Sequence, residues 1–172
     1  MSIERVNDGG VMKAETIVAI CAVVIAVASL GVSVWQAHLA RQHNRHSVRP
    51  VLQLHRGIHH GAHSGIRLIN VGPGPAVIVS SSVSVDGEAI GSWDKACADR
   101  VRAGLPAHLN AVTFGGEEVI ATEYSEYLLS LPHYDAHSHA PIERLLRHRL
   151  SITIDYESLY GGEGFRVVYA PE

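Results

Sequence analysis

The sequence contains little cysteine, few aromatic residues and little charge of either sign. Two of its 172 residues are Cys, 6% are aromatic, 18% are charged, and the formal net charge is −3. Two cysteines exclude a disulfide-rich scaffold. Nucleic-acid binding generally needs an excess of Lys and Arg to neutralise phosphates, so this composition predicts no nucleic-acid partner. The length allows one domain of ordinary size with an appendage, and excludes two full domains.

Recognisable catalytic motifs are also missing. The sequence has no Gly-x-Ser-x-Gly elbow, Cys97 has no His close to it in sequence, and the glycines after Asn70 lack the Lys and Ser/Thr of a phosphate-binding loop. We therefore expect no catalytic residues, no cofactor and no metal site, and we predict that the protein is not an enzyme. Because active sites can be assembled from residues distant in sequence, an enzyme with an unrecognised site remains an alternative.

One long apolar segment is present, and it accounts for much of the positive mean hydropathy of +0.11. It runs from Ile17 to Trp35, and no charged residue lies between Glu15 and Arg41. As a helix, the segment would measure about 29 Å, the thickness of a bilayer core. A cleaved signal peptide fits less well, because its apolar region is usually shorter and a small-x-small cleavage site should follow. We predict a retained transmembrane helix.

The flank after this segment is basic. Arg41, Arg45 and Arg49 are spaced so that a continued helix places them on one face, with no acidic residue between them. This arrangement predicts contact with lipid headgroups, and a plain stop-transfer flank is the simpler interpretation. Within the apolar segment, a face of small residues would allow self-association or docking to another membrane protein. These small residues are Ala19, Ala22, Ala26, Ser29 and Ser33.

From Pro50 onward the periodicity changes from helix to strand. The clearest strand covers 76–85, where one face is apolar and the other largely polar. The apolar face is expected to comprise Val77, Val79, Val83 and Val85. Asp86-Gly87 then predicts a type I′ hairpin turn. Shorter strand candidates are 50–56, 66–71, 89–90, 111–114 and 119–131.

The end of the sequence reads as a second hairpin. Apolar and polar residues alternate over 150–157 and again over 165–169, on either side of a Gly-rich turn. Short helices are expected at 92–102 and 142–149. Together with a leading transmembrane helix, this pattern predicts a mainly β protein whose folded part is an Ig-like antiparallel β-sandwich with one or two short helices. The expected organisation is a tail at 1–15, the transmembrane helix with its basic extension at 16–49, and the sandwich at 50–172.

Three segments carry a resemblance to a known family. They are HNRHSVRPVL (43–52), NVGPGPAVI (70–78) and DYESLYG (155–161). These segments resemble a family of small, single-pass, membrane-anchored bacterial proteins with an Ig-like domain. The resemblance implies a location in the bacterial inner membrane and brings no activity with it. After the helix there are 3 basic residues, and before it there are 2. The positive-inside rule therefore favours a cytoplasmic location for the sandwich, and the periplasm is the alternative location.

Two loops are candidates for binding a partner. In the first, the side chain of Asn70 is expected to form an Asx-turn. Gly72 and Gly74 alternate there with prolines, which lack the backbone N–H needed to continue the hydrogen bonding of a β-sheet. This loop is either a rigid crossing between strands or an exposed loop that presents its backbone to a partner. In the second, Tyr156 and Tyr160 lie among acidic residues near the last turn, which suggests an aromatic, acidic partner face.

Histidine is unusually frequent, with 12 copies. Two groups fall in expected loops, and neutral imidazole is a common ligand of zinc, copper and nickel. The first group is His55, His59, His60 and His63, and the second is His133, His137 and His139. A metal sensor or a pH sensor is therefore an alternative function. Our main hypothesis is a membrane-anchored protein-interaction module, as an accessory subunit of a larger membrane complex, with membrane lipid and another protein or a second copy as partners.

Overall fold

The computed structural model describes residues 8–172, apart from the side chains of residues 8–12 and 42–47. The chain divides into two units, residues 1–44 and residues 45–172. The division falls close to the expected start of the sandwich.

A single long helix accounts for the described part of the first unit. This helix, α1 (Asp8–Ser47), has 40 residues and begins inside the expected 1–15 tail, whose residues 1–7 lie outside the described part. It ends before Pro50, as expected from the steric restriction that proline places on the preceding residue. The side chains from Lys13 to Arg41 are all exposed, and this stretch of 29 residues is long and apolar enough to cross a membrane.

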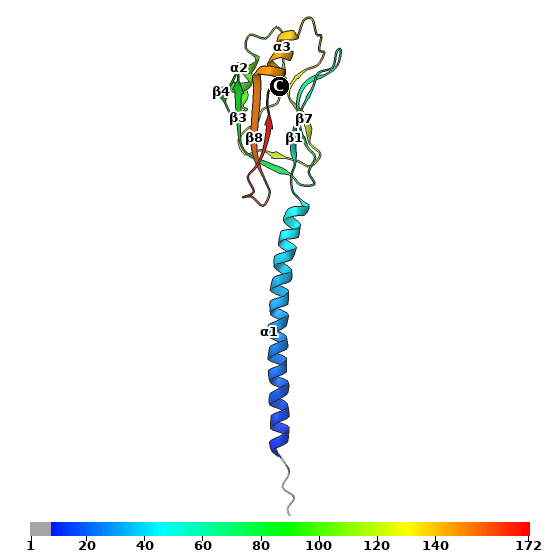
Figure 1. The fold of residues 1–172 in the computed structure, drawn as a ribbon, viewed down its shortest axis with the longest axis vertical. Coiled ribbons are helices and arrows are strands. Elements are labelled where there is room, and N and C mark those ends of the chain that lie inside the picture. Colours follow the sequence, from blue (N-terminus) through cyan, green and yellow to red (C-terminus); the bar gives the residue numbers. More distant parts are fainter. Residues whose placement is uncertain (1–7) are drawn as a thin grey trace, which may run out of the picture. The chain divides into compact units, whose positions relative to one another are not determined.

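The second unit is an antiparallel β-sandwich of two sheets, which confirms the predicted fold class (Figure 1). Sheet 1 has the strand order β1-β2-β7-β5, and sheet 2 has the order β4-β3-β8-β9, with β6 also paired to β3. Sheet 1 consists of β1 (Leu52–Gly57), β2 (Ser64–Asn70), β5 (Asn110–Ala111) and β7 (Ser125–Leu131). Sheet 2 consists of β3 (Ala76–Val85), β4 (Glu88–Gly91), β6 (Val119–Ile120), β8 (Leu150–Ser158) and β9 (Phe165–Tyr169).

The hairpins form where the local sequence predicts them. Asp86 and Gly87 both have positive φ, 54° and 82°, which is the type I′ geometry expected between β3 and β4. In β8, buried and half-buried residues alternate along the whole strand. Its partner β9 pairs Phe165 with Tyr156, and Phe165, Val167 and Tyr169 lie on the face toward the core, whereas Val168 is exposed.

The predicted apolar face of β3 is wrong in its first half. Ile78 is buried, whereas Val79 is 59% exposed. The register between β3 and β8 shifts between Ile78 and Ser80, and this β-bulge moves the following residues to the opposite face. Beyond the bulge, Val83 is buried as expected. A bulge arises from the pairing with the neighbouring strand, so the alternation of apolar and polar residues along one strand does not reveal it.

The short helices lie close to their predicted positions. α2 (Lys95–Arg102) has Asp94 as its N-cap, so it begins three residues after the predicted start at 92, and Gly104 follows it with a positive φ of 79°. The Asp94 carboxylate accepts a hydrogen bond of 2.7 Å from the Cys97 backbone N–H. α3 (Ala140–Arg144) continues directly into a π-helical turn, η1 (Leu145–Arg149).

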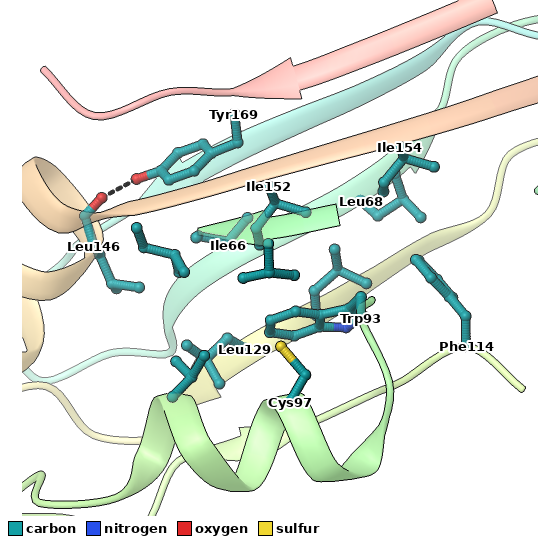
Figure 2. Close-up of a cluster of buried hydrophobic side chains, with 14 of the residues drawn as sticks. Ile66, Leu68, Trp93, Cys97, Phe114, Leu129, Leu146, Ile152, Ile154 and Tyr169 are labelled. Atoms are coloured by element: carbon teal, nitrogen blue, oxygen red, sulfur yellow. Dashed lines mark hydrogen bonds between the residues drawn. The ribbon is translucent and has the colours of Figure 1, made fainter. Parts of the chain in front are cut away.

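The core lies between the two sheets and is closed by these helices. Trp93 is fully buried beside Cys97 of α2, and its indole N–H donates a hydrogen bond of 2.7 Å to the Val112 carbonyl. Figure 2 shows this tryptophan surrounded by aliphatic side chains from both sheets. At the other end of the cluster, the Tyr169 hydroxyl donates to the Leu146 carbonyl, which ties β9 to η1.

Candidate functional site

Asn70 lies at the end of β2 and is 1% exposed. Its side-chain oxygen accepts hydrogen bonds from the backbone N–H groups of Gly72, at 3.1 Å, and Val51, at 3.3 Å. The first of these bonds is the predicted Asx-turn. Its amide nitrogen donates to the carbonyls of Gly74, at 2.9 Å, and Ala121, at 3.0 Å. One buried amide thus joins loop 71–75, the start of β1 and the segment after β6.

Gly72 and Gly74 are buried because loop 71–75 lies against residues 48–51. A Cβ atom on Gly72 would lie 2.3 Å from the Val51 nitrogen, and one on Gly74 would lie 1.8 Å from the Val48 carbonyl oxygen. Only glycine permits such backbone contact. Of the two interpretations of this loop, the rigid crossing between strands accounts for Asn70, Gly72 and Gly74, none of which reaches the surface to present its backbone.

The two candidate tyrosines have different surroundings. Tyr156 is 6% exposed, packs on Phe165 with ring centroids 5.5 Å apart, and accepts a hydrogen bond from the Leu52 backbone N–H. Tyr160, in the turn after β8, is 50% exposed. Tyr156 is therefore a core residue, and Tyr160 is half-exposed at the surface.

The structure describes the side chains of two of the three candidate lipid-binding arginines. Arg41 is exposed at the end of the apolar stretch, and the Arg45 side chain lies outside the described part. Arg49 is exposed and places its guanidinium 4.7 Å from the centre of the Phe165 ring. Arg49 is thus attached to the sandwich and not to a continued helix.

The structure joins the two histidine-rich loops, which sequence spacing alone did not indicate. The Gly61 backbone N–H donates to the Tyr134 carbonyl at 2.7 Å, and His60 forms a bridge with the same residue. The carboxylate of Asp135 accepts hydrogen bonds from Ser138 and from the His137 backbone, which hold its pKa below the usual value. No group of three or more metal-ligating side chains gathers among the described residues.

A row of cationic and aromatic side chains crosses the outer face of sheet 1. His55 on β1 pairs directly with Arg67 on β2, and Arg67 pairs with Tyr127 on β7. Directly paired residues in an antiparallel sheet point to the same face. The Arg67 guanidinium lies 5.5 Å from the centre of the Tyr127 ring, and His63 stacks on that ring at 4.4 Å. We call these four residues the Arg67 surface.

The Arg67 surface borders a shallow hollow of about 290 Å³. Within the described part of the chain, no acidic residue lines this hollow, and Arg67 forms no ion pair. Elsewhere in the sandwich, arginines commonly have carboxylate partners. The pairs are Arg56–Glu172, Arg102–Asp99, Arg147–Glu143, Arg149–Asp86 and Arg166–Asp155. Arg67 therefore offers an exposed guanidinium whose hydrogen-bond donors are free for an anionic group.

Cys97 has the surroundings of a core residue. It is fully buried, and burial raises the pKa of its thiol. A thiol held neutral in this way is a poor nucleophile. Another hollow, of about 430 Å³, lies between the β3–β4 turn and α2, and the Asp86–Arg149 ion pair occupies part of its rim.

No protein-family model matches the chain, and no curated protein matches it. The resemblance to anchored bacterial proteins therefore stays a prediction.

Proposed function

We propose that the chain is a non-catalytic, membrane-anchored protein-interaction module that serves as an accessory subunit of a membrane complex. The observation that carries this proposal is the Arg67 surface, in which an exposed guanidinium without an ion-pair partner among the described residues lies over an aromatic ring. Arg and Tyr are enriched at the energetic centres of protein interfaces. The partner binds through a segment that presents carboxylates to Arg67.

The extent of the row favours a protein partner over a small ligand. His55, Arg67 and Tyr127 lie on three neighbouring strands, and adjacent strands are about 4.8 Å apart. The row is therefore about 10 Å long and lies beside a shallow hollow, which suits an extended acidic segment. A deep, enclosed pocket is the usual site for a small molecule.

The exposed apolar helix supplies the anchor in this proposal. Its side chains from Lys13 to Arg41 have no protein around them, and such a surface is stable in a bilayer or against another apolar helix. We place the anchor in the bacterial inner membrane with the sandwich in the cytoplasm, and we assign Arg41 and Arg45 to lipid headgroups.

The test is partner capture with a charge-reversal pair. The tagged full chain is crosslinked in its native membranes and purified in detergent, and co-purifying proteins are identified by mass spectrometry. Arg67→Glu should abolish the crosslink to the partner, because it places a carboxylate opposite the partner's carboxylates. Arg144→Glu makes the same charge change at another exposed arginine and should retain it.

Two results would count against the proposal. Recovery of a lone monomer with no crosslinked protein would remove the interaction function. Equal recovery of one partner by the wild type and by Arg67→Glu would retain the interaction function but exclude the Arg67 surface as its site.

A further inference from the structure

Three exposed histidines lie around Arg67 and the hollow beside it. His55 on β1 and His59 in the loop after β1 line this hollow together with Arg67. His63 stacks on the Tyr127 ring, with the two ring planes 3° apart and the centroids 4.4 Å apart. The Arg67 guanidinium lies 5.5 Å from the centre of the same ring. One guanidinium and three imidazoles therefore share this surface, and all four side chains are exposed.

The other charged groups around the hollow are paired or belong to another face. Arg56 lines the hollow, but its guanidinium forms an ion pair with Glu172. The Nδ1 atom of His60 lies 3.9 Å from a carboxylate oxygen of Asp135. Glu126 on β7 is one residue away from the row, and successive residues of a strand point to opposite faces. Among the described residues that line the hollow, none offers a carboxylate to balance positive charge.

The charge of this surface depends on pH. Histidine is the side chain that gains a positive charge as the pH falls from about 8 to about 5, whereas arginine is charged throughout. Positive charges that lie close together repel one another, and a carboxylate bound among them offsets that repulsion. Uptake of protons by the histidines and binding of an acidic segment are therefore coupled, and each favours the other.

We propose that His55, His59 and His63 complete a carboxylate-binding site around Arg67, and that they make its affinity for an acidic segment rise as the pH falls; this inference rests on the proposed function of the Arg67 surface. The Nε2 atom of His55 lies 2.8 Å from the side-chain oxygen of Gln53, which orients the ring. When that imidazole is protonated, both of its nitrogens donate, so Nδ1 can donate to a carboxylate of the partner.

The direction of the pH effect follows from the groups on the two sides of the contact. Glutamate and aspartate side chains in a flexible segment stay ionised down to about pH 4.5. Between pH 7.5 and pH 5.5, the histidines therefore gain charge while the carboxylates keep theirs. The parallel stacking of His63 on Tyr127 adds to the effect, because the face of an aromatic ring attracts a cation.

Calorimetric titration of the full chain in a neutral detergent tests the inference, with hexaglutamate as the probe. The affinity of the wild type should be about tenfold higher at pH 5.5 than at pH 7.5, since each exposed ion pair adds a small increment. Titration in buffers with different enthalpies of ionisation counts the protons taken up on binding. The wild type should take up protons at pH 6.5.

Two triple variants fix the charge of the three histidines. The variant with His55→Gln, His59→Gln and His63→Gln should show no rise in affinity at pH 5.5 and no proton uptake. Lysine at the same three positions should give tight binding at both pH values, because lysine is charged at both. The matched control carries His108→Gln, His133→Gln and His137→Gln, all exposed and outside the lining of the hollow, and should keep the wild-type rise.

The inference is overturned if the wild type binds hexaglutamate equally at the two pH values, or at neither. It is also overturned if the first triple variant keeps the wild-type rise. Partner capture separates these failures from failure of the proposed function. If Arg67→Glu abolishes the crosslink while hexaglutamate binding does not change with pH, the interaction function stands and the inference is wrong. If Arg67→Glu leaves both the crosslink and hexaglutamate binding unchanged, the Arg67 surface is not a binding site and the inference falls with it.

Discussion

The Asn70 side chain links three separate segments of the chain at the end of β2. Its amide satisfies backbone donors and acceptors from three parts of the chain, and it is almost completely buried. Each buried polar group that loses its partner costs about 1–3 kcal/mol. The residue is therefore important to the stability of the crossing between sheets.

Asn70→Ala should lower the free energy of unfolding by about 2–4 kcal/mol, because the Val51 and Gly72 N–H groups would lose their acceptor. The measurement is denaturant unfolding of the full chain in detergent, followed by Trp93 fluorescence. Asn110→Ala is the control, since Asn110 is exposed and should change stability by no more than about 0.5 kcal/mol. An equal effect of the two substitutions would contradict the role given to Asn70.

The Tyr134–Glu143 hydrogen bond makes stability depend on pH. The bond to Glu143, with burial, raises the pKa of Tyr134 to about 12. The same bond and the neighbouring Arg147 lower the pKa of Glu143 below its usual 4.5. A carboxylate with a lowered pKa contributes stability above the unfolded value, and the contribution is lost as the pH falls through the folded value.

Glu143→Gln should therefore reduce stability at neutral pH by about 1 kcal/mol and flatten the loss of stability below pH 4.5. Denaturant unfolding at a series of pH values from 7 downward measures both effects. Glu117→Gln removes the same charge from an exposed side chain. Its free energy of unfolding should change with pH in the same way as that of the wild type. If the Glu143→Gln variant also shows the wild-type pH dependence, Glu143 is not the source of that dependence.

Among the structural elements, loop 71–75 depends most strictly on residue size. Its backbone lies so close to residues 48–51 that the first atom of a side chain on Gly74 would overlap the Val48 carbonyl. The contact sets the conformation of the chain where it enters β1. The histidine-rich loops behave differently, because the contact between them is made by backbone hydrogen bonds at Tyr134.

Gly74→Ala should destabilise the sandwich by at least about 2 kcal/mol, because the overlap is with backbone that cannot rotate away. Gly115→Ala is the matched control, since nothing lies within 4 Å of a Cβ atom there. Thermal unfolding of the two full-chain variants compares them directly. Similar melting temperatures would show that residues 48–51 can move without cost.

At the level of the whole molecule, the proposed anchor and the interaction module are separate units with separate requirements. The sandwich buries its own core. The helix exposes its apolar side chains. We therefore expect that changes in the helix alter membrane attachment and leave the fold of the sandwich intact.

Ile25→Arg combined with Val27→Arg should release the chain from membranes, since each central arginine costs about 2.5–3.5 kcal/mol on insertion. The fraction that sediments with membranes after an alkaline carbonate wash measures attachment. Val168→Arg places an arginine on the exposed surface of the sandwich, and this variant should remain attached. Full retention of the doubly substituted helix would argue against a membrane-spanning anchor.

Sequence alone was sufficient for features that depend on neighbouring residues. The apolar helix, the type I′ turn at Asp86-Gly87 and the alternation of β8 follow from local composition and period, and the structure has each of them. Tertiary contacts decided the rest, because they join residues far apart in the chain. The bulge after Ile78 depends on its pairing with β8, and Asn70 became a buried crossing because residues 48–51 fold against its loop. The Arg67 surface exists only because β1, β2 and β7 bring one side chain each to a common face.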